Sequence, residues 1–206
     1  MRRLRTAIGA ALVVGAALIA LPAHATSPSQ QDPNDTPGLL DVRRVTLAPG
    51  RTPRWRITTS ASWTIRRLWD AGYLIVQLDT VGDPGVDHLV VVRSDGRRLL
   101  ATLMRLRADG SERPIATLRA SKQGGRTVGV SVPLGRLTIG PDRTSYLWSV
   151  LTTFTGGACP QTCLDHVPDT GAIEQPLPGV TPTPTPTPTA TPSPTPSPSP
   201  SPSAAG

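Results

Sequence analysis

Short apolar runs alternate with polar turn residues along the middle of this chain. Glycine, proline and aspartate separate the runs, and Asp-Gly pairs such as Asp95-Gly96 and Asp109-Gly110 favour hairpin turns because both residues tolerate positive φ. This pattern predicts eight strands, at 42–48, 54–59, 72–80, 86–94, 98–107, 115–120, 127–134 and 145–154.

Within several runs, apolar and polar residues alternate with the period of two that is typical of a half-buried strand. Trp55 and Ile57, for example, alternate with Arg54 and Arg56. The run 98–107 also fits the helical period, but the turn signals on both sides favour a strand. Eight strands without a long helix predict an all-β fold, an antiparallel, jelly-roll-like β-sandwich.

The N-terminus has the three-part layout of a secretory signal peptide over residues 1–25. Arginines precede a short apolar run that Pro22 stops, and small residues at Ala23 and Ala25 mark the cleavage point. A spanning helix needs about 20 apolar residues, so we expect cleavage and no stable membrane span afterwards. Residues 26–37 are polar and proline-rich and are predicted to be a disordered leader.

At the other end, residues 179–206 form a Pro/Thr/Ser-rich tail. Alternating prolines remove backbone donors and disfavour both helix and sheet, so we expect a disordered, extended spacer. The β-sandwich is then expected over residues 38–178. The protein is expected to be secreted, with association to the cell wall as a further option.

The chain carries 21 basic and 14 acidic residues, and three of the arginines lie in the signal segment, which leaves 18 − 14 = +4. A basic, exported domain favours an anionic cell-envelope polymer or a glycan as partner and does not favour nucleic acid. A monomer is expected. The pairs Arg43-Arg44, Arg66-Arg67 and Arg97-Arg98 are expected to be split between opposite strand faces.

Cys159 and Cys163, the only cysteines, are separated by three residues in CPQTC. In an exported protein a disulfide is the expected state, here one that shapes the segment after the last strand. A redox pair and a metal site are the alternatives.

The inventory of catalytic groups is small, and an enzyme is not expected. Outside the signal segment the histidines are His88 and His166, and His88 alternates with valines as a structural histidine would. The alternatives to a binding module are a structural envelope protein without a specific ligand and a hydrolase with an unrecognised carboxylate pair.

Tryptophans are the candidate glycan-stacking residues. Trp55, set among arginines, and Trp63 are the candidates for ligand binding. Trp69 and Trp148 are expected in the core, because buried aromatic residues dominate cores.

Residues 63–97 resemble the central hairpin of family-9-type carbohydrate-binding and DOMON-like β-sandwiches. The resemblance rests on Trp69-Asp70, on the run Tyr73-Leu74-Ile75-Val76, and on the acidic turn that follows. The strings LDVRR, LDTVGD and VPL, followed by Tyr146 and Trp148, are also similar to exported β-sandwich proteins of actinobacteria. The resemblance implies the fold more than any ligand.

The same resemblance makes Asp79, Asp83 and Asp87 a candidate Ca²⁺ site, since Ca²⁺ takes six to eight oxygen ligands. The alternative is an ordinary hairpin turn, in which aspartate and glycine are common. No other cofactor is expected.

Overall fold

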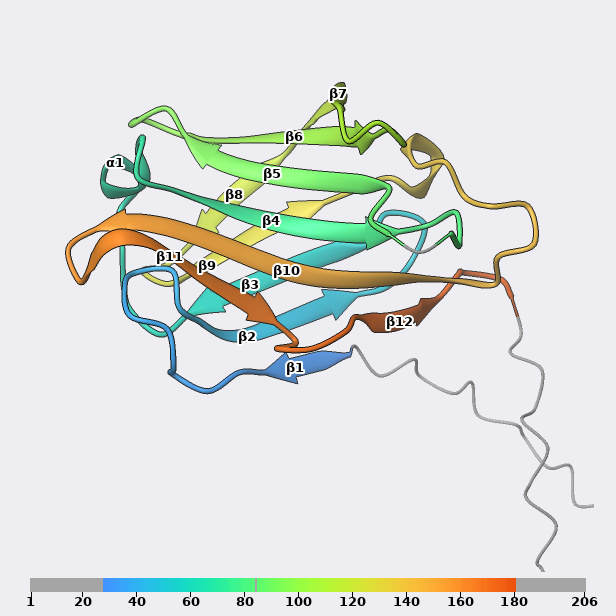
Figure 1. Ribbon diagram of the computed structural model, residues 1–206. Helices are drawn as coiled ribbons and strands as arrows, with labels where there is room; N and C mark the ends of the chain where they lie inside the picture. The colour runs from blue at the N-terminus through green and yellow to red at the C-terminus, as the bar shows by residue number, and fades with distance from the viewer. Residues whose placement is uncertain (1–27, 84, 181–206) are drawn as a thin grey trace, which may run out of the picture.

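The computed structural model describes residues 28–83 and 85–180, and in them two antiparallel sheets pack face to face (Figure 1). The first sheet has five strands, in the spatial order β1 (Ser29–Gln31), β2 (Val42–Ala48), β3 (Arg54–Thr59), β9 (Thr127–Ser131) and β8 (Ala120–Gln123). The second has seven strands, in the order β11 (Cys159–Val167), β10 (Ser145–Gly156), β4 (Gly72–Asp79), β5 (His88–Ser94), β6 (Leu99–Leu106) and β7 (Glu112–Leu118), with β12 (Ile173–Pro176) also paired to β10. The predicted all-β antiparallel sandwich is confirmed.

All eight predicted runs contain strand residues. The ranges 42–48 and 54–59 match β2 and β3 residue for residue, and the run 98–107 is the strand β6 rather than a helix. The run 115–120 divides between the end of β7 and the start of β8. Three further strands, β1, β11 and β12, were not predicted.

The prediction that residues 26–37 are a disordered leader is wrong in part, because residues 29–31 form the strand β1. Within residues 26–37, β1 pairs with β2, where Gln30 lies opposite Val45. The backbone groups of β2 at this edge need partners, and this short polar strand supplies them. The predicted signal peptide, residues 1–25, lies outside the described residues, as does all of the predicted tail beyond residue 180.

Helices are few and short in the described part of the chain. They are α1 (Ile65–Leu68) and the 3-10 turn η1 (Leu134–Arg136). No helix among residues 28–83 and 85–180 is long and apolar enough to cross a membrane.

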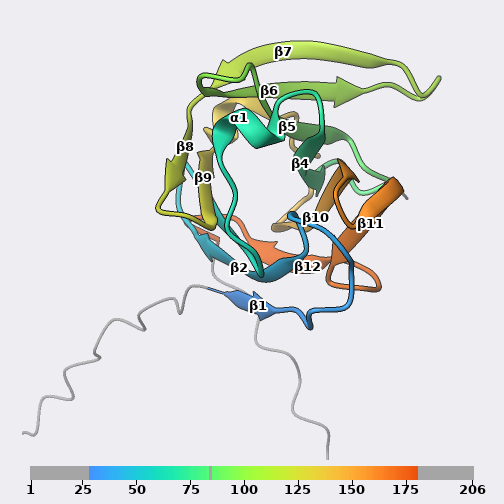
Figure 2. The same cartoon turned by 90° about the vertical axis from the view of Figure 1, so that its left-hand side faces the viewer.

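The core lies between the two sheets and is built around two tryptophans. Trp55 of β3 and Trp148 of β10 meet edge to face, with ring centroids 6.4 Å apart and an interplanar angle of 76°. Both are almost completely buried, as is Tyr146 on the same face of β10. Figure 2 shows the β6–β7 and β8–β9 pairs meeting at one corner of the sandwich.

The predicted disulfide between Cys159 and Cys163 is present, with Cα atoms 5.7 Å apart. Its place differs from the prediction, because both cysteines belong to strand β11 rather than to a segment after the last strand. Phe154 pairs with Cys163 and Gly156 with Cys159, so two steps along β10 correspond to four along β11. The bridge therefore closes a bulge in β11.

Candidate anion-binding face

Three arginines project from the outer face of the five-stranded sheet. Because Trp55 and Ile57 are fully buried, alternation along β3 turns Arg54 and Arg56 outward. Arg44 of β2 lies opposite Thr58, which is the next outward residue of β3, so it projects from the same face. We call Arg44, Arg54 and Arg56 the arginine face.

The sheet around the arginine face carries no negative charge. The five strands of this sheet contain no aspartate or glutamate at all. The other outward residues are small or polar, namely Ser29, Gln31, Thr46, Ala48, Thr58, Ser121, Gln123, Thr127, Gly129 and Ser131. The positive charge of this sheet is therefore not neutralised within it.

Gly129 leaves open the space in which the Arg54 side chain lies. A Cβ atom at Gly129 would lie 3.3 Å from Arg54 Nη2 and 2.8 Å from Gln123 Nε2. The absence of a side chain at Gly129 thus lets both polar side chains lie over β9. Arg54 Nε is buried there without a hydrogen-bond partner, a state that costs free energy until an acceptor is supplied.

A groove continues from Arg54 to the corner where β6 and β7 meet β8 and β9. It has a volume of about 610 Å³, and its charged lining residues are Arg54, Arg98 and Arg119. Leu99, Leu100 and Leu118 supply apolar lining. Of the three arginines, Arg98 has an acidic neighbour, Asp95, at 3.2 Å.

Ion pairs are scarce among the described residues. They join Arg98 to Asp95 and Arg143 to Asp79, and neither of these uses Arg44, Arg54 or Arg56. The guanidinium groups of the arginine face are therefore free to meet an external anion. Arginine suits this task because its planar, permanently charged fork matches carboxylate and phosphate geometry.

A second cavity, of about 600 Å³, lies at the other end of β6. Arg105, Arg107 and Arg113 line it, but so do Asp83 and Asp87. Because its charges are mixed, this cavity is less suited to a polyanion than the arginine face.

The opposite side of the molecule is chemically different. On the outer face of the seven-stranded sheet, Leu151, Ile75 and Val91 form a continuous cross-strand row, all partly buried. Leu89 and Met104 form an apolar pair in the neighbouring row, on β5 and β6. This outer face thus carries an apolar row that the arginine face lacks.

The prediction that the arginine pairs are split between opposite faces is wrong. Arg43 and Arg44 lie at a register shift in β2, and both side chains are exposed. Arg66 and Arg67 lie on α1. Arg54 and Arg56, two residues apart on β3, do share one face. The alternation of this strand in the sequence already indicates that arrangement.

The two tryptophans proposed as glycan platforms are both buried. Trp55 has no exposed surface and Trp63 is 4% exposed. Lys122 Nζ lies 4.0 Å from the centroid of the Trp63 ring, and Trp63 Nε1 donates to Thr59 Oγ1. Neither ring is available for stacking on a sugar, so both assignments are wrong as surface sites.

Trp69, expected in the core, is instead 61% exposed. It follows α1 directly, where no strand alternation directs it inward, and it lies against Gly96 of the β5–β6 turn. Tyr73, at the start of β4, is also exposed, and both aromatic residues line a small depression with Arg93. Trp148, by contrast, is buried as predicted.

Two aspartates of the acidic turn between β4 and β5 stabilise the turn by accepting hydrogen bonds from its backbone. Asp87 Oδ2 accepts hydrogen bonds from the backbone amides of Thr80 at 2.6 Å and Val81 at 2.8 Å. Asp79 Oδ1 accepts from Gly82 N and pairs with Arg143. Asp83 is exposed on the turn. Among the described residues, Asp79, Asp83 and Asp87 do not form a cluster that one metal ion could span.

His88 is buried beside this turn, in the structural role that its alternation with valines indicated. Its Nδ1 lies 3.1 Å from Thr80 Oγ1, which donates to Thr138 O, while its Nε2 accepts from Thr138 N. This pattern fits a neutral ring protonated on Nδ1. Burial lowers the pKa of His88, which agrees with that neutral state.

Comparison with protein-family models, with curated proteins and with solved structures gave no match for this chain.

Proposed function

We propose that this protein is an exported, non-catalytic binding module that holds an anionic cell-envelope polymer on its arginine face. The observation that carries the proposal is the five-stranded sheet that presents Arg44, Arg54 and Arg56 and contains no acidic residue. The signal-like N-terminus and the disulfide, a bond of oxidising compartments, support the exported location.

The geometry favours a linear polymer with regularly spaced phosphate or carboxylate groups. Alternate residues of a strand are about 7 Å apart, so Arg54 and Arg56 offer two fixed, neighbouring positive charges. The groove beyond Arg54 extends the contact toward Arg98 and Arg119. An anionic oxygen in this groove would pair with the guanidinium group of Arg54, which lines it.

The test removes two arginines and measures binding to inorganic polyphosphate and to polygalacturonate, with neutral dextran as the blank. For the double variant Arg54→Gln/Arg56→Gln we expect the dissociation constant to rise about 10-fold or more, because two charge-assisted contacts are lost. The matched control is Arg66→Gln/Arg67→Gln, which removes the same charge from exposed positions on α1.

If both double variants weaken binding equally, net charge alone attracts the polymer, and the protein would be an envelope protein without a specific site. Salt separates the same alternatives. The screening length falls from about 10 Å at 0.1 M salt to about 3 Å at 1 M. Saturable binding that survives moderate salt supports the arginine face, whereas binding that vanishes supports charge alone.

A second candidate, recognition of a neutral glycan, rests on the exposed pair Trp69 and Tyr73. Exposed aromatic rings are the surfaces on which sugar rings stack. For this candidate we expect saturable retention on an immobilised glycan that Trp69→Ala abolishes without lowering the midpoint of thermal unfolding. Equal retention of Trp69→Ala and the unaltered protein would exclude it.

A further inference from the structure

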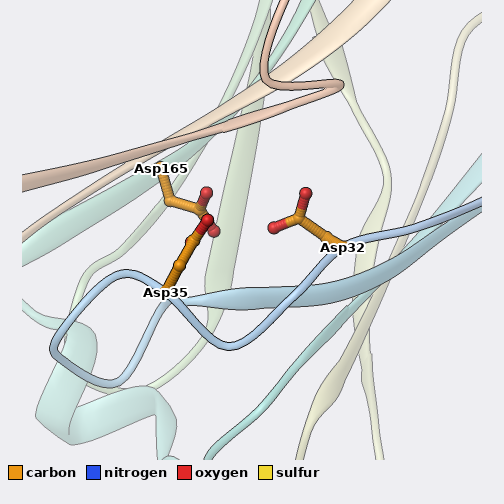
Figure 3. A group of neighbouring side chains, drawn as sticks. All are labelled: Asp32, Asp35 and Asp165. Carbon is orange, nitrogen blue, oxygen red and sulfur yellow. The ribbon is translucent and has the colours of Figure 1, made fainter.

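Three carboxylates from distant parts of the sequence meet beside β11. Asp32 and Asp35 belong to the segment between β1 and β2, and Asp165 lies in β11. Figure 3 shows their carboxylates pointing toward one another, and one oxygen of each lies within 4.8 Å of the others. Asp165 is almost completely buried, and its Oδ2 accepts a hydrogen bond from Val42 N.

A fourth carboxylate, that of Asp41, adds an unpartnered oxygen. Asp41 is only 1% exposed. Its Oδ1 accepts from Thr36 N at 3.1 Å, whereas its Oδ2 is buried without any hydrogen-bond partner. Asp41 adjoins the cluster, because its partner Thr36 follows Asp35 and because Val42, the residue after Asp41, donates its backbone N–H to Asp165. Asp32 Oδ2 is likewise buried without a partner.

No cation of the described chain neutralises this cluster. The ion pairs of the described residues join Arg98 to Asp95 and Arg143 to Asp79, both elsewhere. Burial, and then the charges of Asp165, Asp169, Asp35 and Asp41, raise the pKa of Asp32 to about 7. A domain that is basic overall thus concentrates carboxylates at one point without an ion pair among the described residues to neutralise them, an arrangement that costs free energy unless a cation binds.

The donor set selects a hard divalent cation. The three clustered residues offer oxygen alone, without the imidazole or thiolate that zinc prefers. Ca²⁺–oxygen distances are about 2.3–2.6 Å, so two oxygens on opposite sides of one ion are about 5 Å apart. The observed separations fall within that limit. Several carboxylates in one all-protein site suit Ca²⁺, whereas Mg²⁺ retains most of its water and usually takes one or two carboxylates.

We propose that Asp32, Asp35 and Asp165, supported by Asp41, bind one Ca²⁺ ion that fastens the N-terminal segment to β11. Neighbouring contacts already link the same elements, because Thr36 Oγ1 donates to Leu164 O. The ion would cross-link a short edge strand, β1, to the strand that carries the disulfide. This site is distinct from the turn at Asp79, Asp83 and Asp87, and it does not depend on the arginine face.

The first measurement is the thermal unfolding midpoint of the chain after treatment with EDTA and after addition of CaCl2 or MgCl2. At a Ca²⁺ concentration of about 100 times the dissociation constant, we expect the midpoint to rise by about 5–10 °C. Mg²⁺ is expected to give a smaller rise at the same concentration. Calorimetric titration with CaCl2 is expected to show one site per chain.

Two isosteric variants, Asp32→Asn and Asp35→Asn, test the ligands. Asp35 is exposed, and an asparagine there keeps the Oδ1 acceptor that Thr36 Oγ1 contacts at 3.5 Å. Asp32 Oδ2 has no hydrogen-bond partner, so its replacement by an amide breaks no bond at that atom. Both variants are expected to lose most of the Ca²⁺-dependent rise. In EDTA they are expected to melt at or above the unaltered protein, because each removes one repelling charge. Asp83→Asn, the matched control on the other acidic segment, should keep the full rise.

Identical midpoints of the unaltered protein in CaCl2 and EDTA, together with no heat of binding, would overturn the proposal. So would loss of the Ca²⁺-dependent rise in Asp83→Asn with retention in Asp35→Asn. A midpoint of Asp32→Asn well below that of the unaltered protein in EDTA would also contradict it, since the carboxylate would then stabilise the fold without an ion.

Discussion

Replacing Trp55 with alanine is expected to lower the free energy of unfolding by about 3–5 kcal/mol, the usual cost of truncating a large buried aromatic side chain. Trp55 has no exposed surface, and its ring meets the edge of Trp148 across the two sheets. Its cross-strand neighbours on β2 and β9 are Leu47 and Val130, both buried. The cavity left by alanine would therefore open at the centre of the sandwich. Urea unfolding, followed by circular dichroism, measures the change.

The control is Trp69→Ala, which removes the same side chain from an exposed position. Its effect on the free energy of unfolding is expected to stay within about 0.5 kcal/mol. Domains of this size are stable by about 5–15 kcal/mol, so the Trp55 variant loses a large fraction of the total. An unchanged free energy of unfolding in Trp55→Ala, together with loss of ligand binding, would contradict this expectation and support a role of Trp55 at the surface.

The contrast between these tryptophans explains where sequence reasoning succeeded and where it failed. Strand β3 was predicted residue for residue because its alternation is regular. The same alternation places Trp55 inward whenever Arg54 and Arg56 face outward. The charged neighbours nevertheless suggested an open position for Trp55. Trp69 follows a four-residue helix, where no period of two applies, so its exposure had no local signal.

The strands that escaped prediction have few β-branched or aromatic residues. β1 reads SQQ and lies at the edge of its sheet, beside β2. β11 reads CPQTCLDHV, and the bulge at its disulfide breaks the alternation. Such strands are defined by the free edge beside them, which is a property of the assembled sheet and not of their own sequence.

The acidic cluster could not be found from sequence spacing. Asp32 and Asp35 are more than a hundred residues from Asp165, and they lie in a segment whose composition indicated disorder. The three aspartates at the β4–β5 turn, evenly spaced in the sequence, gave the stronger local pattern. In the structure, Asp79 and Asp87 accept hydrogen bonds within the turn. The carboxylates that converge, those of Asp32, Asp35 and Asp165, come from separate elements.

Asp87→Ala is expected to lower the free energy of unfolding by about 2–4 kcal/mol, because hydrogen bonds to a charged acceptor contribute about 1.5–3 kcal/mol each. The change leaves the amides of Thr80 and Val81 without their acceptor. Thr80 is completely buried, so water cannot replace the lost bond at that amide. Its hydroxyl also contacts His88 and Thr138, which extends the damage into the core. Chemical denaturation with a fluorescence readout measures the loss.

Asp83→Ala, on the same turn but exposed, is the control and should unfold within about 0.5 kcal/mol of the unaltered chain. The Asp87 deficit should be the same in EDTA and in CaCl2, since this carboxylate accepts from the backbone and needs no metal. If the three aspartates of the turn instead held an ion together, the deficits of both variants would appear in CaCl2 and shrink in EDTA. A Ca²⁺-independent loss confined to Asp87 therefore identifies the turn as a hydrogen-bonded hairpin, with the ion bound elsewhere.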